Sequence, residues 1–182
     1  MEQGLFEVMY SLRAMRRLKP DRVPEDVVWK VLEAGTMAPS GGNTQPWHFV
    51  VVRDPATKRA LADTKNRHCP PEKKAFPADF LAHAPVVVVI CVDVERSHDR
   101  ELENGVLAAG HLLLAARARG LGAVYLSAHT AGRPALRSDV KRLLAIPAAV
   151  DPVSIVPLGH PARRPAAKAL RELRTMIHDE RF

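Results

Sequence analysis

The 182-residue sequence predicts a single α+β domain, covering residues 1–182, in which helices flank a few buried strands. Three observations lead to this prediction. Helical and strand periodicities alternate along the chain, without an internal repeat or a linker. The longest apolar run, residues 84–92, is rich in β-branched residues and far shorter than the ~20 residues of a membrane helix, so it is typical of a buried strand. The Gly-x-Gly-x-x-Gly fingerprint of doubly wound nucleotide-binding folds is absent from the sequence.

The first third of the chain contains the signals for three helices and one strand. Pro24 and the two acidic residues after it favour a helix start, and Pro39 ends that helix. Asp54 precedes a proline and is a typical N-cap residue. The expected elements are helices at residues 5–14, 24–39 and 54–63 and a strand at residues 48–53.

The rest of the chain alternates strands with helices. We expect strands at residues 85–93, 123–126 and 153–158, helices at 100–119 and 134–144, and a basic, proline-interrupted tail at 159–182. The helix at 100–119 is apolar on two faces, so it is expected to be buried on more than one side, in the core or at a dimer interface. Residues 65–77 lack periodicity and are expected to form a mobile surface loop that could act as a lid.

Composition narrows the classes of function. The net charge of +7 favours either a nucleic-acid surface or a site for a phosphate-bearing ligand, but the basic residues are dispersed and no nucleic-acid-binding motif accompanies them. We therefore expect no nucleic-acid partner. Cys69 and Cys91 have no metal-ligand spacing and are not expected to form a disulfide, so no metal site is expected. No membrane span or secretory signal is visible, and a cytoplasmic location is the expectation.

The most informative stretch of the sequence is the turn at residues 38–47. Pro39, Gly41 and Gly42 interrupt the helical pattern and let the backbone approach a ligand closely. The polar side chains between the prolines can grip a flat ring with heteroatoms at its edge; they are Ser40, Asn43, Thr44 and Gln45. The alternative is an ordinary helix-to-strand turn, whose amides satisfy their own backbone and whose Trp47 packs in the core.

Residues 38–49 resemble the pattern Ala-Pro-Ser-x-x-Asn-x-Gln-Pro-Trp-x-Phe of the FMN-dependent nitroreductase family at every specified position. Three further segments resemble family motifs in the same order, at residues 12–25, 112–123 and 156–161. The first of these departs from the family pattern Arg-Arg-Ser-x-Arg-x-Phe, because Leu12, Ala14 and Leu18 replace an arginine, the serine and the aromatic residue.

The resemblance implies a nitroreductase-like three-layer sandwich, with a mixed and mainly antiparallel sheet, in an intertwined homodimer that holds FMN at the subunit interface. It implies cofactor contacts from four groups of residues. These are Arg13, Ala14 and Arg16 at the phosphate and pyrimidine side; Pro39, Ser40, Gly41, Asn43 and Gln45 at the ring edge; Leu126, Ser127 and Ala128 at the N5 side; and Lys168 and Arg171 in the tail. Arg163, Arg164 and Arg174 are the alternatives in the tail, which could also be simply solvated.

The function that the resemblance implies is an NAD(P)H oxidoreductase. NADH or NADPH would deliver hydride to the flavin N5, leave, and be replaced by a nitroaromatic, a quinone or a similar acceptor. No side chain is expected to act as a catalytic acid or base, because the flavin carries the chemistry. Two alternatives stay open. One is a reductive dehalogenase like iodotyrosine deiodinase, which residues 134–137 and 158–161 also resemble, and the other is a non-enzymatic flavin-binding or nucleic-acid-binding protein.

Overall fold

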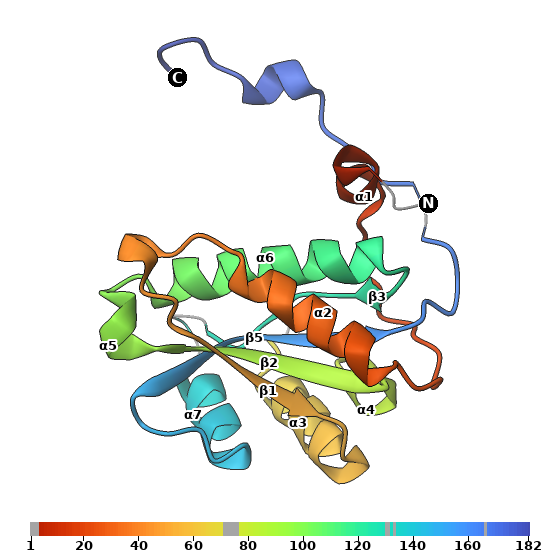
Figure 1. The fold of residues 1–182 in the computed structure, drawn as a ribbon, viewed down its shortest axis with the longest axis vertical. Coiled ribbons are helices and arrows are strands. Elements are labelled where there is room, and N and C mark those ends of the chain that lie inside the picture. The colour runs from red at the N-terminus through yellow and green to blue at the C-terminus, as the bar shows by residue number, and fades with distance from the viewer. Residues whose placement is uncertain (1–3, 71–76, 130–131, 133, 166) are drawn as a thin grey trace.

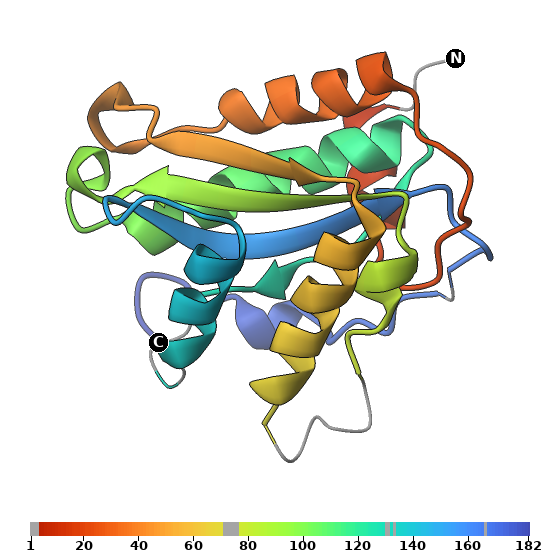
Figure 2. The ribbon, with the colours of Figure 1, turned by 90° about the horizontal axis from the view of Figure 1, so that it is seen from below.

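A computed structural model of the chain describes residues 4–70, 77–129, 132, 134–165 and 167–182. The described residues form three layers, with the sheet in the middle (Figure 1). Helices α2 (Glu25–Thr36) and α6 (Glu101–Ala118) cover one face of the sheet. Helices α3 (Pro55–Arg67), α4 (Phe80–His83) and α7 (Pro134–Leu143) cover the other face (Figure 2). The predicted α+β three-layer sandwich is confirmed.

The sheet contains five strands in the described residues. They are β1 (Trp47–Val52), β2 (Val86–Asp93), β3 (Gly122–Ala123), β4 (Leu126–Ser127) and β5 (Val150–Gly159). The strand order is β1-β2-β5-β3, and β4 also pairs with β5. All of these pairings are antiparallel, and a single isolated bridge between Ala14 and Ala123 is parallel. The sheet is thus mainly antiparallel, as predicted.

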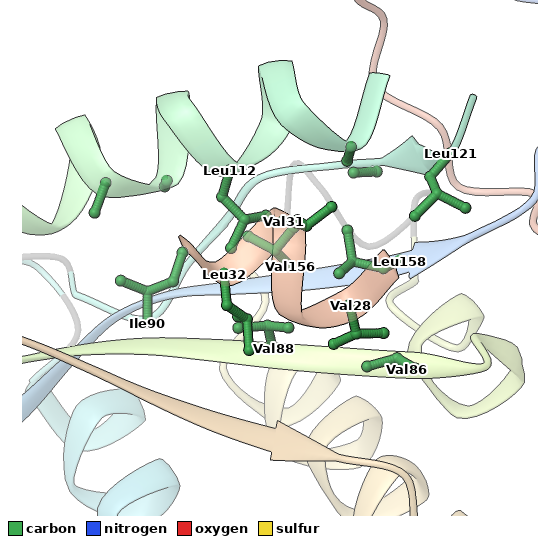
Figure 3. Packing of buried hydrophobic residues seen from close by; sticks show 14 of the residues in the cluster. Val28, Val31, Leu32, Val86, Val88, Ile90, Leu112, Leu121, Val156 and Leu158 are labelled. Carbon is green, nitrogen blue, oxygen red and sulfur yellow. The ribbon is translucent and has the colours of Figure 1, made fainter. Parts of the chain in front are cut away.

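The alternating residues of β2 explain why this strand is apolar along its whole length. Val86, Val88 and Ile90 pack toward α2 and α6 (Figure 3), whereas the residues between them pack toward α3 and α7. Successive strand residues point to opposite faces, so a sheet covered on both sides needs apolar residues at every position. Cys91 lies in this buried strand, and burial raises the pKa of its thiol to about 12. Both cysteines are free thiols.

Several element boundaries differ from the expected ones. Helix α1 (Leu5–Ser11) ends three residues early, because the chain from Leu12 onward is extended. Helix α3 continues to Arg67, into the expected loop, and residues 71–76 of that loop lie outside the described residues. The expected strand at 123–126 is two short strands. Helix α5 (Val94–Ser97), helix α4 and the 3-10 turns η1 (Gly41–Asn43) and η3 (Leu173–Met176) were not predicted.

Helix α6 buries only one of its two apolar faces within the chain. Ala108, Leu112 and Ala116 are fully buried against the sheet, but Leu102 and Val106 are each 43% exposed. The expectation of burial on more than one side is therefore not met by a single chain. The tail leaves the three layers beside α1 (Figure 1) and exposes apolar residues as well; they are Leu170, Leu173, Met176, Ile177 and Phe182. No helix among the described residues has the length and apolarity needed to cross a membrane.

Candidate functional site

The arginine-rich segment at residues 12–19 lies between β3 and the start of the tail. The Met15 amide donates to the Ala123 carbonyl at 2.8 Å, and the Lys19 amide donates to the His160 carbonyl at 2.8 Å. The Ala162 amide returns a hydrogen bond to the Arg17 carbonyl at 3.0 Å. Three of the four sequence motifs are therefore adjacent in space, although the contacts of the first motif join it to residues more than 100 positions later in the chain.

Gly122 explains how the segment can lie so close to β3. A Cβ atom at this position would lie 2.9 Å from Met15 Cβ and 2.9 Å from Leu18 Cδ2. Contacts this short essentially do not occur between carbon atoms, so any other residue would push the segment away. The second glycine of the Gly-Leu-Gly motif therefore positions the arginine segment.

Five arginines line one cavity of about 800 Å³, which we call the arginine cavity. They come from the N-terminal segment and from the start of the tail: Arg13, Arg16, Arg17, Arg163 and Arg164. No carboxylate belongs to the described lining residues. The fork of a guanidinium group matches the oxygens of a phosphate, and a cluster of guanidinium groups favours an anion. This cavity has the charge and the donors to hold a phosphate group.

Some of the residues predicted to bind the phosphate line this cavity, and others do not. Arg13, Ala14 and Arg16 line it, as do Arg163 and Arg164, which sequence reasoning kept only as alternatives. The lining reaches Ala167 in the tail, whereas Lys168 and Arg171, which follow, are exposed and do not belong to it. Their phosphate contact stays a prediction.

The polar turn, defined as residues 39–45, is held by its own hydrogen bonds. The Gln45 amide donates to Ser40 Oγ at 3.1 Å, and the Gln45 side-chain Nε2 donates to Asn43 Oδ1 at 3.2 Å. Asn43 and Gln45 have positive φ angles of 55° and 48°, an uncommon conformation for residues other than glycine. The two amide side chains thus pair with each other and keep donor and acceptor atoms free at an exposed edge.

Asn104 fastens the polar turn to α6. Its Oδ1 accepts a hydrogen bond from the Gly41 amide at 3.4 Å, and its carbonyl accepts one from Trp47 Nε1 at 3.0 Å. Asn104 is only 2% exposed. Sequence reasoning missed this residue. The signal that could have found it is a lone amide on the buried face of an otherwise apolar helix, since such a group needs polar partners.

The third predicted group follows β4. Ser127 Oγ donates to the His129 carbonyl at 2.6 Å, and the Ala128 amide donates to the Val153 carbonyl at 2.8 Å. The Ser127 carbonyl accepts a hydrogen bond from Lys65 Nζ at 2.7 Å. The hydroxyl proton of Ser127 and the amide of Ala128 are thus already used within the chain, whereas Lys65 brings a cation to this strand.

The polar turn and the segment at residues 12–19, which lines the arginine cavity, lie at opposite ends of α6 (Figure 1). Asn104 anchors the turn near the helix start, and Arg117 near the helix end donates from Nε to Ser11 Oγ at 2.9 Å. Residues 104 and 117 are about 20 Å apart along the helix, at a rise of 1.5 Å per residue. The described residues contain no cluster of three or more His, Cys, Asp or Glu residues that could hold a metal ion.

These features define the class as an α+β sandwich with an arginine-lined cavity at one end and an amide-rich turn at the other. The chain belongs to the nitroreductase family, whose family model matches residues 11–160. This family consists of oxidoreductases, so the protein is an enzyme of that class.

Named relatives and solved structures agree with the family. The chain is 30% identical to an NADH dehydrogenase/NAD(P)H nitroreductase of Methanothermobacter thermautotrophicus, over 93% of this chain and 83% of the relative. It is 28% identical to an iodotyrosine deiodinase of Thermotoga neapolitana, over 86% and 88% of the two chains. A crystal structure of an NADH dehydrogenase/NAD(P)H nitroreductase from Parabacteroides distasonis matches with a TM-score of 0.85 at 27% identity, over all of both chains. A Desulfovibrio desulfuricans nitroreductase solved in complex with FMN matches with a TM-score of 0.76 at 26% identity, over 100% and 99%.

Proposed function

We propose that this protein is an FMN-dependent oxidoreductase that takes hydride from NADH or NADPH and passes it to a nitroaromatic, a quinone or a similar acceptor. The observation that carries the proposal is the arginine cavity, which gathers five guanidinium groups and no carboxylate among its described lining residues. It occurs in a chain similar to a nitroreductase solved with FMN. FMN has one dianionic phosphate and a flat ring, which match the cavity and the polar turn respectively.

The residues present fit this cofactor. Arg13 and Arg16, with Arg163 and Arg164, would hold the phosphate, and the polar turn would meet the ring edge with its backbone and amide groups. When bound, FMN supplies the two-electron chemistry by accepting hydride and passing it on. The protein then binds and orients the ring. The polar turn contains no acid and no base, so the proposed reaction does not rely on a proton donor there.

We further infer that two chains form each site. Helix α6 exposes Leu102 and Val106, and Gly110 and Leu113 continue the same stripe toward the helix end. A Cβ atom at Gly110 would meet nothing within 4 Å, so this stripe has room for a second helix. If two α6 helices pack antiparallel about a two-fold axis, the polar turn of one chain lies beside the arginine cavity of the other. The exposed apolar tail supports the same arrangement, because a partner would cover it.

The test is the absorption spectrum of the purified protein, followed by identification of the released chromophore. Arg16→Ala should weaken FMN binding about 10- to 100-fold, because a hydrogen bond to a charged group contributes about 1.5–3 kcal/mol. Arg59→Ala is the matched control, since Arg59 lies on α3, is paired with Asp79 and does not belong to the described lining of the cavity. The proposal would be contradicted by a colourless protein that retains no flavin after incubation with FMN and removal of the free cofactor.

Reductive dehalogenation is the second candidate, which the similarity to the iodotyrosine deiodinase of Thermotoga neapolitana favours. The two candidates share the flavin and differ in the acceptor. Oxidation of NAD(P)H with a quinone and turnover of iodotyrosine, measured on the same preparation, separate them. Halide release faster than quinone reduction would replace the first candidate with the second. Flavin binding without either activity would leave a flavin-binding protein.

A further inference from the structure

Arg100, the residue before α6, lies against the polar turn. Its Cδ is 3.3 Å and its Nη1 is 3.5 Å from the place where a Cβ atom of Gly41 would lie. Gly41 therefore leaves the space that the Arg100 side chain fills. The turn that is proposed to meet the ring edge has a cation directly beside it.

No carboxylate among the described residues forms an ion pair with Arg100. Some exposed arginines have carboxylate partners, such as Arg53 with Glu25 and Arg142 with Asp139. Arg100 is exposed as well. The guanidinium group is thus available to an anion from outside.

A second and independent observation points to a ligand at the same place. The side-chain Nδ2 of Asn104, whose Oδ1 binds the Gly41 amide, is buried without a hydrogen-bond partner. The Thr44 Oγ1 in the polar turn is buried without a partner as well. Buried donors are nearly always satisfied by protein, water or ligand, because leaving one unpaired is costly. The polar turn therefore has unused hydrogen-bonding groups on the side where Arg100 lies.

We propose that Arg100 is an anion-recognising residue at the ring-edge turn, which selects substrates that carry a carboxylate or phosphate group. This inference rests on the proposed function and adds the substrate class. A guanidinium group binds such oxygens in a bidentate manner, which fixes the orientation of the substrate as well as its position. The anion is either the carboxylate of an aromatic acceptor or a phosphate of the nicotinamide nucleotide.

The experiment compares Arg100→Ala with wild type on paired substrates that differ in charge. The acceptor pair is 4-nitrobenzoate and its methyl ester, and the donor pair is NADPH and the neutral 1-benzyl-1,4-dihydronicotinamide. We expect the kcat/KM ratio of anionic to neutral substrate to fall about tenfold in one of the two pairs, which identifies the source of the anion. Arg100→Lys should keep part of this ratio, because it keeps the charge but loses the fork. Arg96→Ala removes an exposed arginine that lines a pocket with Thr44, Asp93 and Glu95, and it should leave both ratios unchanged because two carboxylates share that pocket.

Two results would overturn the proposal: both ratios unchanged in Arg100→Ala, or an equal fall in Arg96→Ala, which would show a general effect of net charge. A binding measurement separates this failure from that of the proposed function. Benzoate is not reduced, and its Kd from calorimetry needs neither flavin nor turnover. If the wild type lacks flavin activity but its benzoate affinity falls about tenfold in Arg100→Ala and not in Arg96→Ala, the anion site stands and the proposed reaction fails. If Arg100→Ala binds both benzoate and inorganic phosphate as the wild type does, the anion site is refuted.

Discussion

If each flavin site is built from two chains, two defective variants restore each other's flavin binding when they associate. The first variant, Arg13→Ala with Arg16→Ala, removes cations from the arginine cavity. The second, Asn43→Gly with Gln45→Gly, removes the side chains of the polar turn, and glycine keeps the positive φ angles of both positions. The altered regions lie at opposite ends of α6, so each variant leaves the other region intact (Figure 1).

The expected magnitude follows from the two-fold symmetry. Each charge-assisted hydrogen bond lost in the first variant weakens FMN binding by about 1.5–3 kcal/mol, and each neutral one lost in the second weakens it by about 0.5–1.5 kcal/mol. Each variant alone should therefore lose most of its flavin at micromolar concentration. Each site combines the arginine cavity of one chain with the polar turn of the other. In a mixed dimer, one site therefore contains both altered regions, and the other site contains the intact cavity and the intact turn. Random association makes about half of the dimers mixed, and about one quarter of all sites should then bind flavin.

The assay is co-expression of the two variants with different affinity tags, followed by measurement of flavin per chain. The mixed dimers, isolated through both tags, should carry about one flavin per two chains, while each pure variant carries much less. Mixed dimers without flavin would show that both regions of a site come from one chain. A monomer that sediments with bound flavin would refute the shared site altogether.

Gly105→Ala should lower the Tm by about 2–10 °C in scanning calorimetry, because the new Cβ would lie 2.6 Å from Val153 Cβ and overpacking a core costs about 1–3 kcal/mol; an unchanged Tm would contradict the packing of α6 on β5. Asp139→Asn should lower the Tm at pH 7, with the gap to wild type closing as the pH falls below 3.8. The hydrogen bond from His68 holds the pKa of Asp139 below that usual value, so its stabilising effect is present above it and lost in acid; a gap that persists in acid would refute this cause. Ala14→Ser should tighten FMN binding about fivefold in a titration of apoprotein, since a new hydrogen bond contributes about 1 kcal/mol; an equal Kd would place the hydroxyl out of reach.

The long elements were predictable from the sequence because their periodicity is set by burial. The run at residues 85–93 is apolar at each position from Val86 to Val92, and in the structure it is β2, covered on both faces. Helices α4 and α5 were missed because four residues are too few to show a helical period. The strand expected at 123–126 is interrupted between β3 and β4, although the pairs Ala123–Leu158 and Leu126–Ile155 keep one antiparallel register along β5. Such pairing depends on contacts with β5, which local sequence does not contain.

The candidate site was predictable where its residues are close together in the sequence. The polar turn stands out because prolines, glycines and amides are gathered within a few residues. The arginine cavity was only half predictable, because Arg163 and Arg164 reach it through the contact of Ala162 with Arg17. The tail has no periodicity from which to rank its basic residues. The role of Asn104 was also not predictable from local sequence, because its partner Gly41 is 63 residues away in the chain.

The positions where the N-terminal segment departs from the family pattern are accounted for by its packing. Leu18 occupies the place of the family's aromatic residue, and it lies between two glycines, with its Cδ2 2.9 Å from the Cβ position of Gly122 and its Cβ 3.2 Å from that of Gly159. Leu18 thus packs into the space that the two glycines leave open. Ala14 is held by its backbone bridge to Ala123, so the missing serine hydroxyl does not move the segment. Because packing and backbone bonds fix the segment, the substitutions change which side chains meet a ligand and still leave Arg16 at the cavity. The arginines can therefore keep a phosphate-binding role in a segment whose other side chains have changed.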